Sequence, residues 1–290
     1  FTKEEIVGQD SGRRAVVALD LDGDGDVDVL DASDFAHTVS WYENQDEYNW
    51  GRKKSPMSFE AHVVTASADG ARSVAARDLD GDGDVDVLVA SMDDDTVAWH
   101  ENSGRVGYTP RVDFTRHIIK DGRGQPQDAA AADLDDDGAM DVVAGFFNED
   151  GVAWYESDCV TSPPTRASFN PVPAPTPRPT ERCQEVAFTA REVQPDYTNN
   201  KPRCVFAADL DADGDMDALV AGHNSGSSSN YVLDWFELDF EHDDTFHDHE
   251  LDADLDDDAE FDAVYAVDVD ADGDVDVVAA SSTPGAVYWY

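Results

Sequence analysis

Short runs of alternating apolar and polar residues recur along the chain, separated by turns rich in Gly, Asp, Ser and Asn. Residues 85–90 are typical, residues 96–101 carry a tryptophan within a similar run, and residues 114–119 begin a third run with a phenylalanine. A period of two, with enrichment in β-branched and aromatic residues, predicts β-strands. A helical period has little support anywhere, so the pattern predicts an all-β protein.

The runs belong to a unit that repeats around a nine-residue acidic stretch. The first copy occupies residues 20–28, and four related copies occupy residues 78–86, 133–141, 209–217 and 268–276. One strand enters the stretch, one leaves it, a third carries the tryptophan and a fourth begins with the phenylalanine. Four short strands per unit are typical of the blades of a β-propeller.

Five such units predict one β-propeller domain over residues 1–290. The chain begins with a phenylalanine strand over residues 1–7 and stops within a tryptophan strand over residues 286–290. Because the first strand can complete the last unit and remove an exposed sheet edge, we expect a closed five-bladed ring. The alternative is an open arc of a larger, seven-bladed propeller. Residue 1 is Phe and no signal peptide is visible, so we expect a piece of a longer chain.

Residues 161–180 interrupt the third unit with Pro, Ser and Thr and almost no large apolar side chain. Such a segment cannot pack a core and is typical of extended polyproline chain, so we expect a mobile or O-glycosylated insertion loop within the domain. Cys159 and Cys183 flank this segment, and a disulfide between them would close its base. The alternative is that both are free thiols, as Cys204 would be.

The acidic stretches have the residue types and spacing of a hard-cation site. Carboxylates at positions 1, 3, 5 and 9, with the backbone carbonyl of position 7, would supply about six or seven oxygen ligands, which favours Ca²⁺. Glycine at position 6 permits the positive φ that folds the loop around an ion. We therefore expect about five calcium ions, one per unit. The candidate metal ligands are Asp20, Asp22, Asp24, Asp26 and Asp28; Asp78, Asp80, Asp82, Asp84 and Asp86; Asp133, Asp135, Asp137 and Asp141; Asp209, Asp211, Asp213, Asp215 and Asp217; and Asp268, Asp270, Asp272, Asp274 and Asp276.

The charge balance limits the partners. The chain has 65 acidic and 19 basic residues and a formal net charge of −46, which argues against nucleic acid and anionic membranes. The few basic residues recur in the loops before the entering strands. Arg13, Arg72 and Arg123 are therefore candidates for a polar ligand site around the central channel, and ion pairing between blades is the alternative. Trp50 lies outside the repeat pattern and can either stack on a sugar ring or cover a blade edge.

With these acidic stretches, the unit resembles the FG-GAP/VCBS repeat family, the calcium-loop propeller repeat of integrin α-subunit heads and of some fungal and bacterial lectins. The resemblance implies a β-propeller with calcium in the loops between entering and leaving strands, usually seven-bladed and extracellular. No nucleophile-base pattern or phosphate loop occurs, so we expect no enzyme. The expected function is that of a secreted or cell-surface module for adhesion, scaffolding or assembly, which binds protein or glycan through its loops. A calcium-stabilised lectin is the alternative.

Overall fold

The computed structural model describes residues 5–7, 12–45, 58–104, 112–122, 124–148, 151–158, 186–193, 200–224, 231–239, 245–251, 260–283 and 285–290. Within these ranges the chain forms nineteen strands and no helix, so the prediction of an all-β protein is confirmed. It follows that the described residues contain no helix able to cross a membrane.

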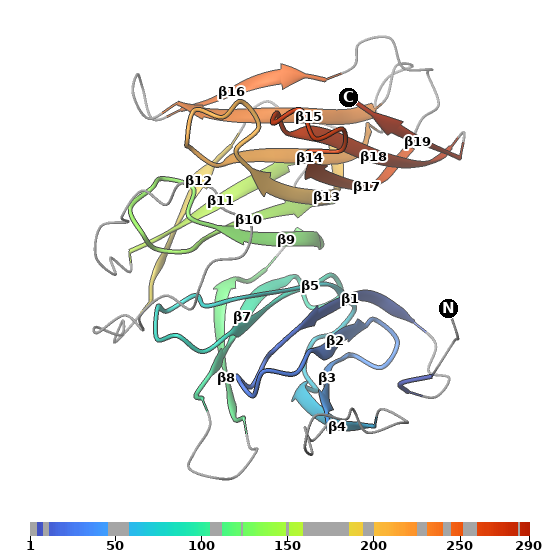
Figure 1. Cartoon of the computed structure of the whole chain (residues 1–290), viewed down its shortest axis with the longest axis vertical. Helices are drawn as coiled ribbons and strands as arrows, with labels where there is room; N and C mark the ends of the chain where they lie inside the picture. Colours follow the sequence, from blue (N-terminus) through green and yellow to red (C-terminus); the bar gives the residue numbers. More distant parts are fainter. Residues whose placement is uncertain are drawn as a thin grey trace.

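The strands form five antiparallel sheets, which we number as blades 1 to 5 in chain order (Figure 1). Blade 1 contains β1 (Arg13–Leu19), β2 (Asp28–Ser33), β3 (Thr38–Asn44) and β4 (Phe59–Thr65). Blade 2 contains β5 (Ala71–Arg77), β6 (Asp86–Ser91), β7 (Thr96–Asn102) and β8 (Phe114–Lys120). Blade 3 contains β9 (Pro126–Ala132), β10 (Asp141–Phe146), β11 (Gly151–Ser157) and β12 (Phe188–Glu192). Blade 4 contains β13 (Asn200–Ala208), β14 (Asp217–Asn224), β15 (Tyr231–Asp239) and β16 (Thr245–Glu250). The described part of blade 5 contains β17 (Glu260–Val267), β18 (Asp276–Thr283) and β19 (Ala286–Trp289).

Apolar side chains are buried between successive blades. Trp41 of blade 1 packs in one cluster with Val74 of blade 2, and Trp154 of blade 3 packs in another with Val205 of blade 4. Two further clusters join blade 2 to blade 3 and blade 4 to blade 5. Each unit of the sequence thus forms one blade, and the predicted five-bladed β-propeller is confirmed.

The predicted closing strand over residues 1–7 falls partly outside the described residues. Ile6 and Val7 form a bend, Glu5 lies outside any regular element, and no strand of the described part pairs with these residues. The side chains of Val287 and Trp289 on β19 are 72% and 56% exposed, because no following blade covers them in the described part of the chain. The predicted strand is therefore wrong over residues 5–7, and completion of blade 5 by the rest of it, residues 1–4, stays a prediction.

Strand register places the acidic stretches at one end of the propeller. In every blade the first two strands pair right up to the stretch, as in Leu19 with Asp28 and Arg77 with Asp86. The stretch is therefore the turn between these strands. The beginnings of the first strands lie at the opposite end, about 20 Å away for a seven-residue strand. The propeller thus separates an acidic face from the face where the first strands begin.

Candidate metal centre

We call each acidic stretch a cage and number its residues 1 to 9. Position 6 is glycine in all five cages, with φ between 93° and 107° at Gly25, Gly83, Gly138, Gly214 and Gly273. This left-handed backbone turns the amide of position 6 toward the carboxylate of position 1. Gly25 donates to Asp20 Oδ2 at 2.9 Å, and Gly83 donates to Asp78 Oδ2 at 2.9 Å. Glycine is needed here because other residues rarely adopt such a φ.

Positions 3 and 5 form two consecutive side-chain turns. Asp24 N donates to Asp22 Oδ1 at 3.1 Å, and Asp26 N donates to Asp24 Oδ1 at 2.9 Å. The same pair of hydrogen bonds recurs in the other four cages. These turns curl the loop, so that carboxylate oxygens of Asp20, Asp22 and Asp28 lie within 4.8 Å of one another. The third cage brings together the same three positions, and the second cage brings together positions 1, 3 and 5.

The aspartate at position 9 joins the cage to the third strand of its blade. Asp86 is fully buried and accepts from Leu79 N and from Asn102 N, both at 2.8 Å. Asp28 and Asp141 make the corresponding pairs of hydrogen bonds. Burial raises the pKa of Asp86 to about 8 and that of Asp141 to about 7, although the two backbone donors oppose the shift. These carboxylates lack a compensating positive charge among the described residues.

Position 1 provides a direct test of whether the cage fits a cation. The Oδ1 atoms of Asp78, Asp133 and Asp209 are buried and make no hydrogen bond. An unpaired buried carboxylate oxygen is costly, and a hard cation is the partner that an all-oxygen donor set would take. Burial, followed by repulsion from Asp137, also raises the pKa of Asp135 to about 6. The cages therefore have the all-oxygen donor set of a Ca²⁺ site, and their buried negative charge is not balanced by a positive charge among the described residues.

Position 7 contributes least through its side chain. It is Ala139 in the third cage, which keeps the same turns. In the second cage the Asp84 carboxylate lies against Gly104, where an added Cβ would come within 2.2 Å of Asp84 Oδ2. This agrees with a backbone role for position 7, so the Asp26, Asp84, Asp215 and Asp274 carboxylates are the weakest members of the predicted ligand set.

The structure adds a glutamate that the sequence analysis missed. Glu43 of β3 is 4% exposed and brings a carboxylate oxygen within 4.8 Å of those of Asp22 and Asp24. In blades 3 and 4, Glu156 and Glu237 are close enough to the cages to raise the pKa of the aspartates at position 3. The sequence signal is a Trp-x-Glu motif, which occurs in the third strand of blades 1 to 4.

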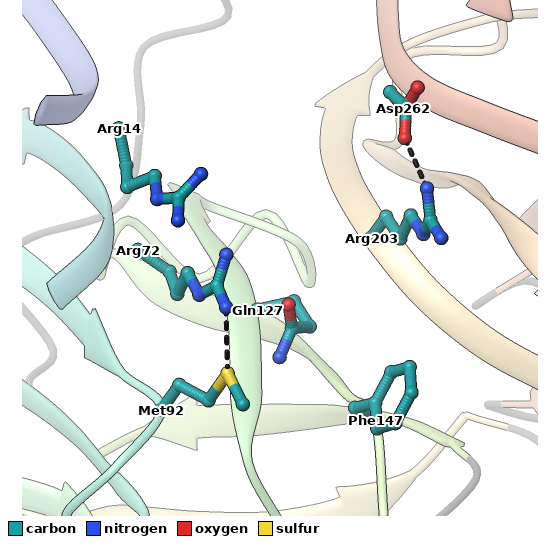
Figure 2. A pocket seen from close by; sticks show the side chains of 7 residues that line it. All are labelled: Arg14, Arg72, Met92, Gln127, Phe147, Arg203 and Asp262. Carbon is teal, nitrogen blue, oxygen red and sulfur yellow. Dashed lines mark hydrogen bonds and ion pairs between the residues drawn. The ribbon is translucent and has the colours of Figure 1, made fainter. Parts of the chain in front are cut away.

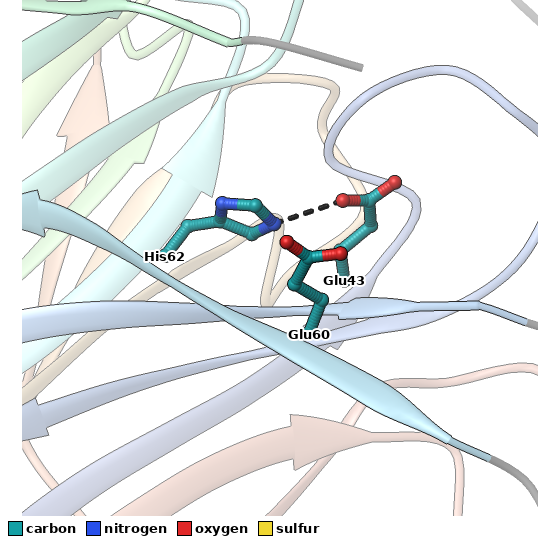
Figure 3. A group of neighbouring side chains, drawn as sticks. All are labelled: Glu43, Glu60 and His62. Atoms are coloured by element: carbon teal, nitrogen blue, oxygen red, sulfur yellow. Dashed lines mark hydrogen bonds and ion pairs between the residues drawn. The ribbon is translucent and has the colours of Figure 1, made fainter.

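The same glutamate pairs with a histidine from the fourth strand. His62 Nε2 lies 2.8 Å from Glu43 Oε2, and the His62 ring stacks on Trp41 with centroids 4.6 Å apart. Figure 3 shows Glu60 beside this pair, and the three side chains bring ligand atoms within 4.8 Å of one another. However, blades 2 and 4 repeat the pair (His117–Glu101 and His249–Glu237) with the same stacking on tryptophan, and blade 3 uses Arg191 and Glu156. The histidine is therefore a repeat residue that covers the tryptophan.

The other predicted site residues have different outcomes. Arg13 pairs with buried Asp31 and donates to the Tyr42 hydroxyl at 2.9 Å, so it is held within blade 1. Arg72 lines a cavity at the propeller centre. Cys204 is a partly buried free thiol whose pKa is raised by burial. Four predicted residues lie outside the described ranges: Arg123, Trp50, Cys159 and Cys183.

Comparison with protein families identifies this unit. The model of the FG-GAP-like repeat matches residues 20–89 and 78–144. The two matches begin at the first aspartates of the first and second cages, so the family's repeat is in register with the cages. A search of curated proteins found no match. The resemblance to the FG-GAP/VCBS repeat family is confirmed.

Proposed function

We propose that this five-bladed β-propeller, in which residues 20–144 match the FG-GAP-like repeat, is a calcium-stabilised module for binding other proteins. The observation that carries the calcium assignment is the set of buried, unpartnered Oδ1 atoms at position 1 of three cages. Ca²⁺ would supply positive charge and oxygen coordination at these points.

Electrostatics across the whole chain support the same assignment. Each cage gathers at least four aspartates into one nine-residue turn, and the net charge is −46. Carboxylates this close repel one another strongly where water does not screen them. Five divalent cations would cancel about ten negative charges at the places where the repulsion is greatest. The residues expected to hold each ion are the aspartates at positions 1, 3, 5 and 9, with the third-strand glutamate beside them.

The hydrogen bonds around the cages connect local order to the whole propeller. Asn102 Nδ2 donates to Val85 O of its own blade at 3.0 Å and to Leu21 O of blade 1 at 3.2 Å. The first cage is thus tied to the neighbouring blade as well as to its own strands. Fixing the cages would therefore stiffen the blades and the loops between them, and the loops are the surfaces that a partner would meet.

We assign the module to the outside of the cell and to a non-catalytic role. Calcium sites of extracellular modules have dissociation constants of about 0.1–1 mM, a concentration of Ca²⁺ found outside the cytosol. A disulfide between Cys159 and Cys183 would require the same compartment. The cages are turns filled by their own carboxylates, whereas catalytic metal sites keep a position open. Trp50, the aromatic candidate for the lectin alternative, lies outside the described residues.

Calcium uptake by the chelator-treated chain tests the proposal. Calorimetric titration should find roughly five ions per chain, and replacing Asp133 and Asp135 by Asn should remove one of them. Asp121→Asn, at an exposed position outside the cages, should leave the number unchanged. Absence of uptake at millimolar calcium would refute the assignment.

For the interaction role, the immobilised chain should capture a protein from extracellular fluid in the presence of calcium and release it in EGTA. Equal capture in calcium and in EGTA would count against the role.

A further inference from the structure

A cavity of about 450 Å³ opens at the centre of the propeller, on the face opposite the cages. Figure 2 shows the side chains that point into it from all five blades. Five of them come from the first strands of the blades, and Met92 and Phe147 follow β6 and β10. The lining residues are Arg14, Arg72, Met92, Gln127, Phe147, Arg203 and Asp262.

The five first-strand residues occupy one repeat position. Each stands six residues before the first aspartate of its cage, so the fold places them in a ring around the channel. We call this set the channel ring. Three of its members are arginines in a chain with only 19 basic residues. This repeat position is therefore rich in positive charge, whereas the chain as a whole is strongly acidic. The channel ring consists of Arg14, Arg72, Gln127, Arg203 and Asp262.

Two of the three arginines are already paired. Arg14 Nε donates to Asp34 Oδ2 at 2.5 Å. Arg203 forms an ion pair with Asp262 of the next blade, and a second with Glu260 at 3.2 Å. The two contacts of Arg203 match the alternative of ion pairing between blades, whereas Arg14 pairs within blade 1.

Arg72 differs from the other two arginines. Its Nη2 donates to the thioether of Met92 at 3.1 Å, which is a weak acceptor. Its Nε is buried without a hydrogen-bond partner, and no carboxylate forms an ion pair with it among the described residues. Asp93 lines a neighbouring cavity of about 360 Å³ that Arg72 also borders, but it makes no ion pair with Arg72. A guanidinium in this state lacks the anion that its planar fork of donors would bind.

We infer that the channel ring binds the carboxylate group of an organic acid, with Arg72 as the anchor. A guanidinium binds a carboxylate through two parallel hydrogen bonds, and Gln127 on the adjacent blade can donate or accept a further one. Phe147 and Met92 offer an apolar wall for the rest of the ligand. The cavity volume falls within the range of small-molecule sites. A singly charged carboxylate is also repelled less by the strongly negative chain than a phosphate would be.

The inference does not depend on the calcium proposal. The ring and the cages lie at opposite ends of the first strands, about 20 Å apart. Calcium uptake and carboxylate binding can therefore be measured and lost separately. The carboxylate can belong to a free organic acid or to the C-terminus of a partner protein, and the two sources differ in what else must fit into the cavity.

The test uses phenylacetate and its neutral analogue phenylacetamide as probes of the calcium-treated full chain. Ligand-observed NMR titrations give the two affinities at low and at moderate salt. We expect phenylacetate to bind at least about tenfold more tightly than the amide and to weaken with salt, because only the acid pairs with a guanidinium. Arg72→Gln should abolish this preference, and Arg72→Lys should keep part of it. Arg77→Gln is the matched control, because Arg77 lies at the other end of β5 and donates a hydrogen bond to the backbone carbonyl of Ala76.

Equal affinity for the acid and the amide, or unchanged phenylacetate binding in Arg72→Gln, would overturn the inference. Tighter binding of inorganic phosphate than of phenylacetate would also overturn it. So would a lack of phenylacetate binding up to about 10 mM, a concentration at which ligands of this size are expected to bind. Melting curves establish whether the Arg72 variants fold. If Arg72→Gln does not fold, the wild-type preference for the acid over the amide and its partial retention in Arg72→Lys decide between the outcomes, since an uncharged contact would not favour the acid. A short acetylated peptide with a free C-terminus, compared with its amide, then distinguishes the two sources of the carboxylate.

Discussion

The buried aspartate at position 9 predicts an unusual pH dependence for the calcium-free protein. Asp86 has a pKa near 8 because burial disfavours its charged form. In the unfolded chain its pKa is close to 3.8. A carboxyl group whose pKa is higher in the folded state stabilises that state below pH 3.8, and this contribution disappears as the pH rises toward 8. Without calcium, the protein should therefore be more stable at pH 5.5 than at pH 8, which is opposite to the usual behaviour of a paired carboxylate.

The size of the effect follows from the same two pKa values. Each unit of pKa difference corresponds to about 1.4 kcal/mol. Between pH 5.5 and pH 8, the unfolding free energy should fall by about 3 kcal/mol through Asp86 alone. For a chain of this length, that corresponds to a decrease of roughly 6–12 °C in the melting temperature. Asp141, with a pKa near 7, should add to the decrease.

Calcium should reverse this dependence, because a bound cation favours the ionised carboxylates and its binding releases protons. The assay is thermal unfolding across this pH range, in excess EGTA and in millimolar calcium. In EGTA, Asp86→Asn should flatten the dependence of the melting temperature on pH. Asp121→Asn should leave that dependence unchanged and so controls for the loss of one negative charge from the acidic surface. If the calcium-free protein becomes more stable from pH 5.5 to pH 8, the electrostatic interpretation of the cages is wrong.

Two further predictions concern the backbone. Ala271, at position 4 of the fifth cage, has a φ of 63°, which costs an alanine about 1 kcal/mol. Ala271→Gly should therefore raise the unfolding free energy by about 0.5–1 kcal/mol. Gly273→Ala, at a φ of 104° in open space, should lower it by at least about 1 kcal/mol. If denaturant unfolding shows no difference between the two variants, these backbone angles are not strained for alanine. Gly145→Ala should destabilise by about 1–3 kcal/mol, because the new Cβ would lie 2.7 Å from the Cβ of Pro202 in blade 4; an unchanged denaturant midpoint would show that the two blades can separate at no cost.

The blades and cages could be predicted from the sequence because they depend on spacing within one unit. The position of Gly25 relative to Asp20 determines the turn, and alternation along the next strand determines which side chains enter the core. The positive φ at position 4 was not predicted, because Gly23 occupies this position in one cage and Ala271 in another. Only the structure shows that both adopt the left-handed region.

Residues that depend on contacts between distant segments were harder to predict. Arg13 was a candidate for the channel, but the structure places its neighbour Arg14 there. Adjacent residues of a strand point to opposite faces. A prediction that is wrong by one position therefore places in the channel a side chain that in fact points into the blade. In the same way, Arg14 and Arg72 hold equivalent positions, and nothing in the local sequence indicates that only Arg14 has a carboxylate partner among the described residues.

The five copies within one chain also indicate which residues the fold requires. Position 9 of the cage is aspartate in every copy, as its two backbone hydrogen bonds in blades 1 to 3 would require. The channel ring differs: arginine, glutamine and aspartate all occupy it, and each is compatible with the same strand. The propeller therefore does not need an arginine at this position in order to fold. Arg72 is a half-buried cation that the fold does not require, and it makes no ion pair with the described residues of a strongly acidic chain. A ligand explains such an arginine better than stability does.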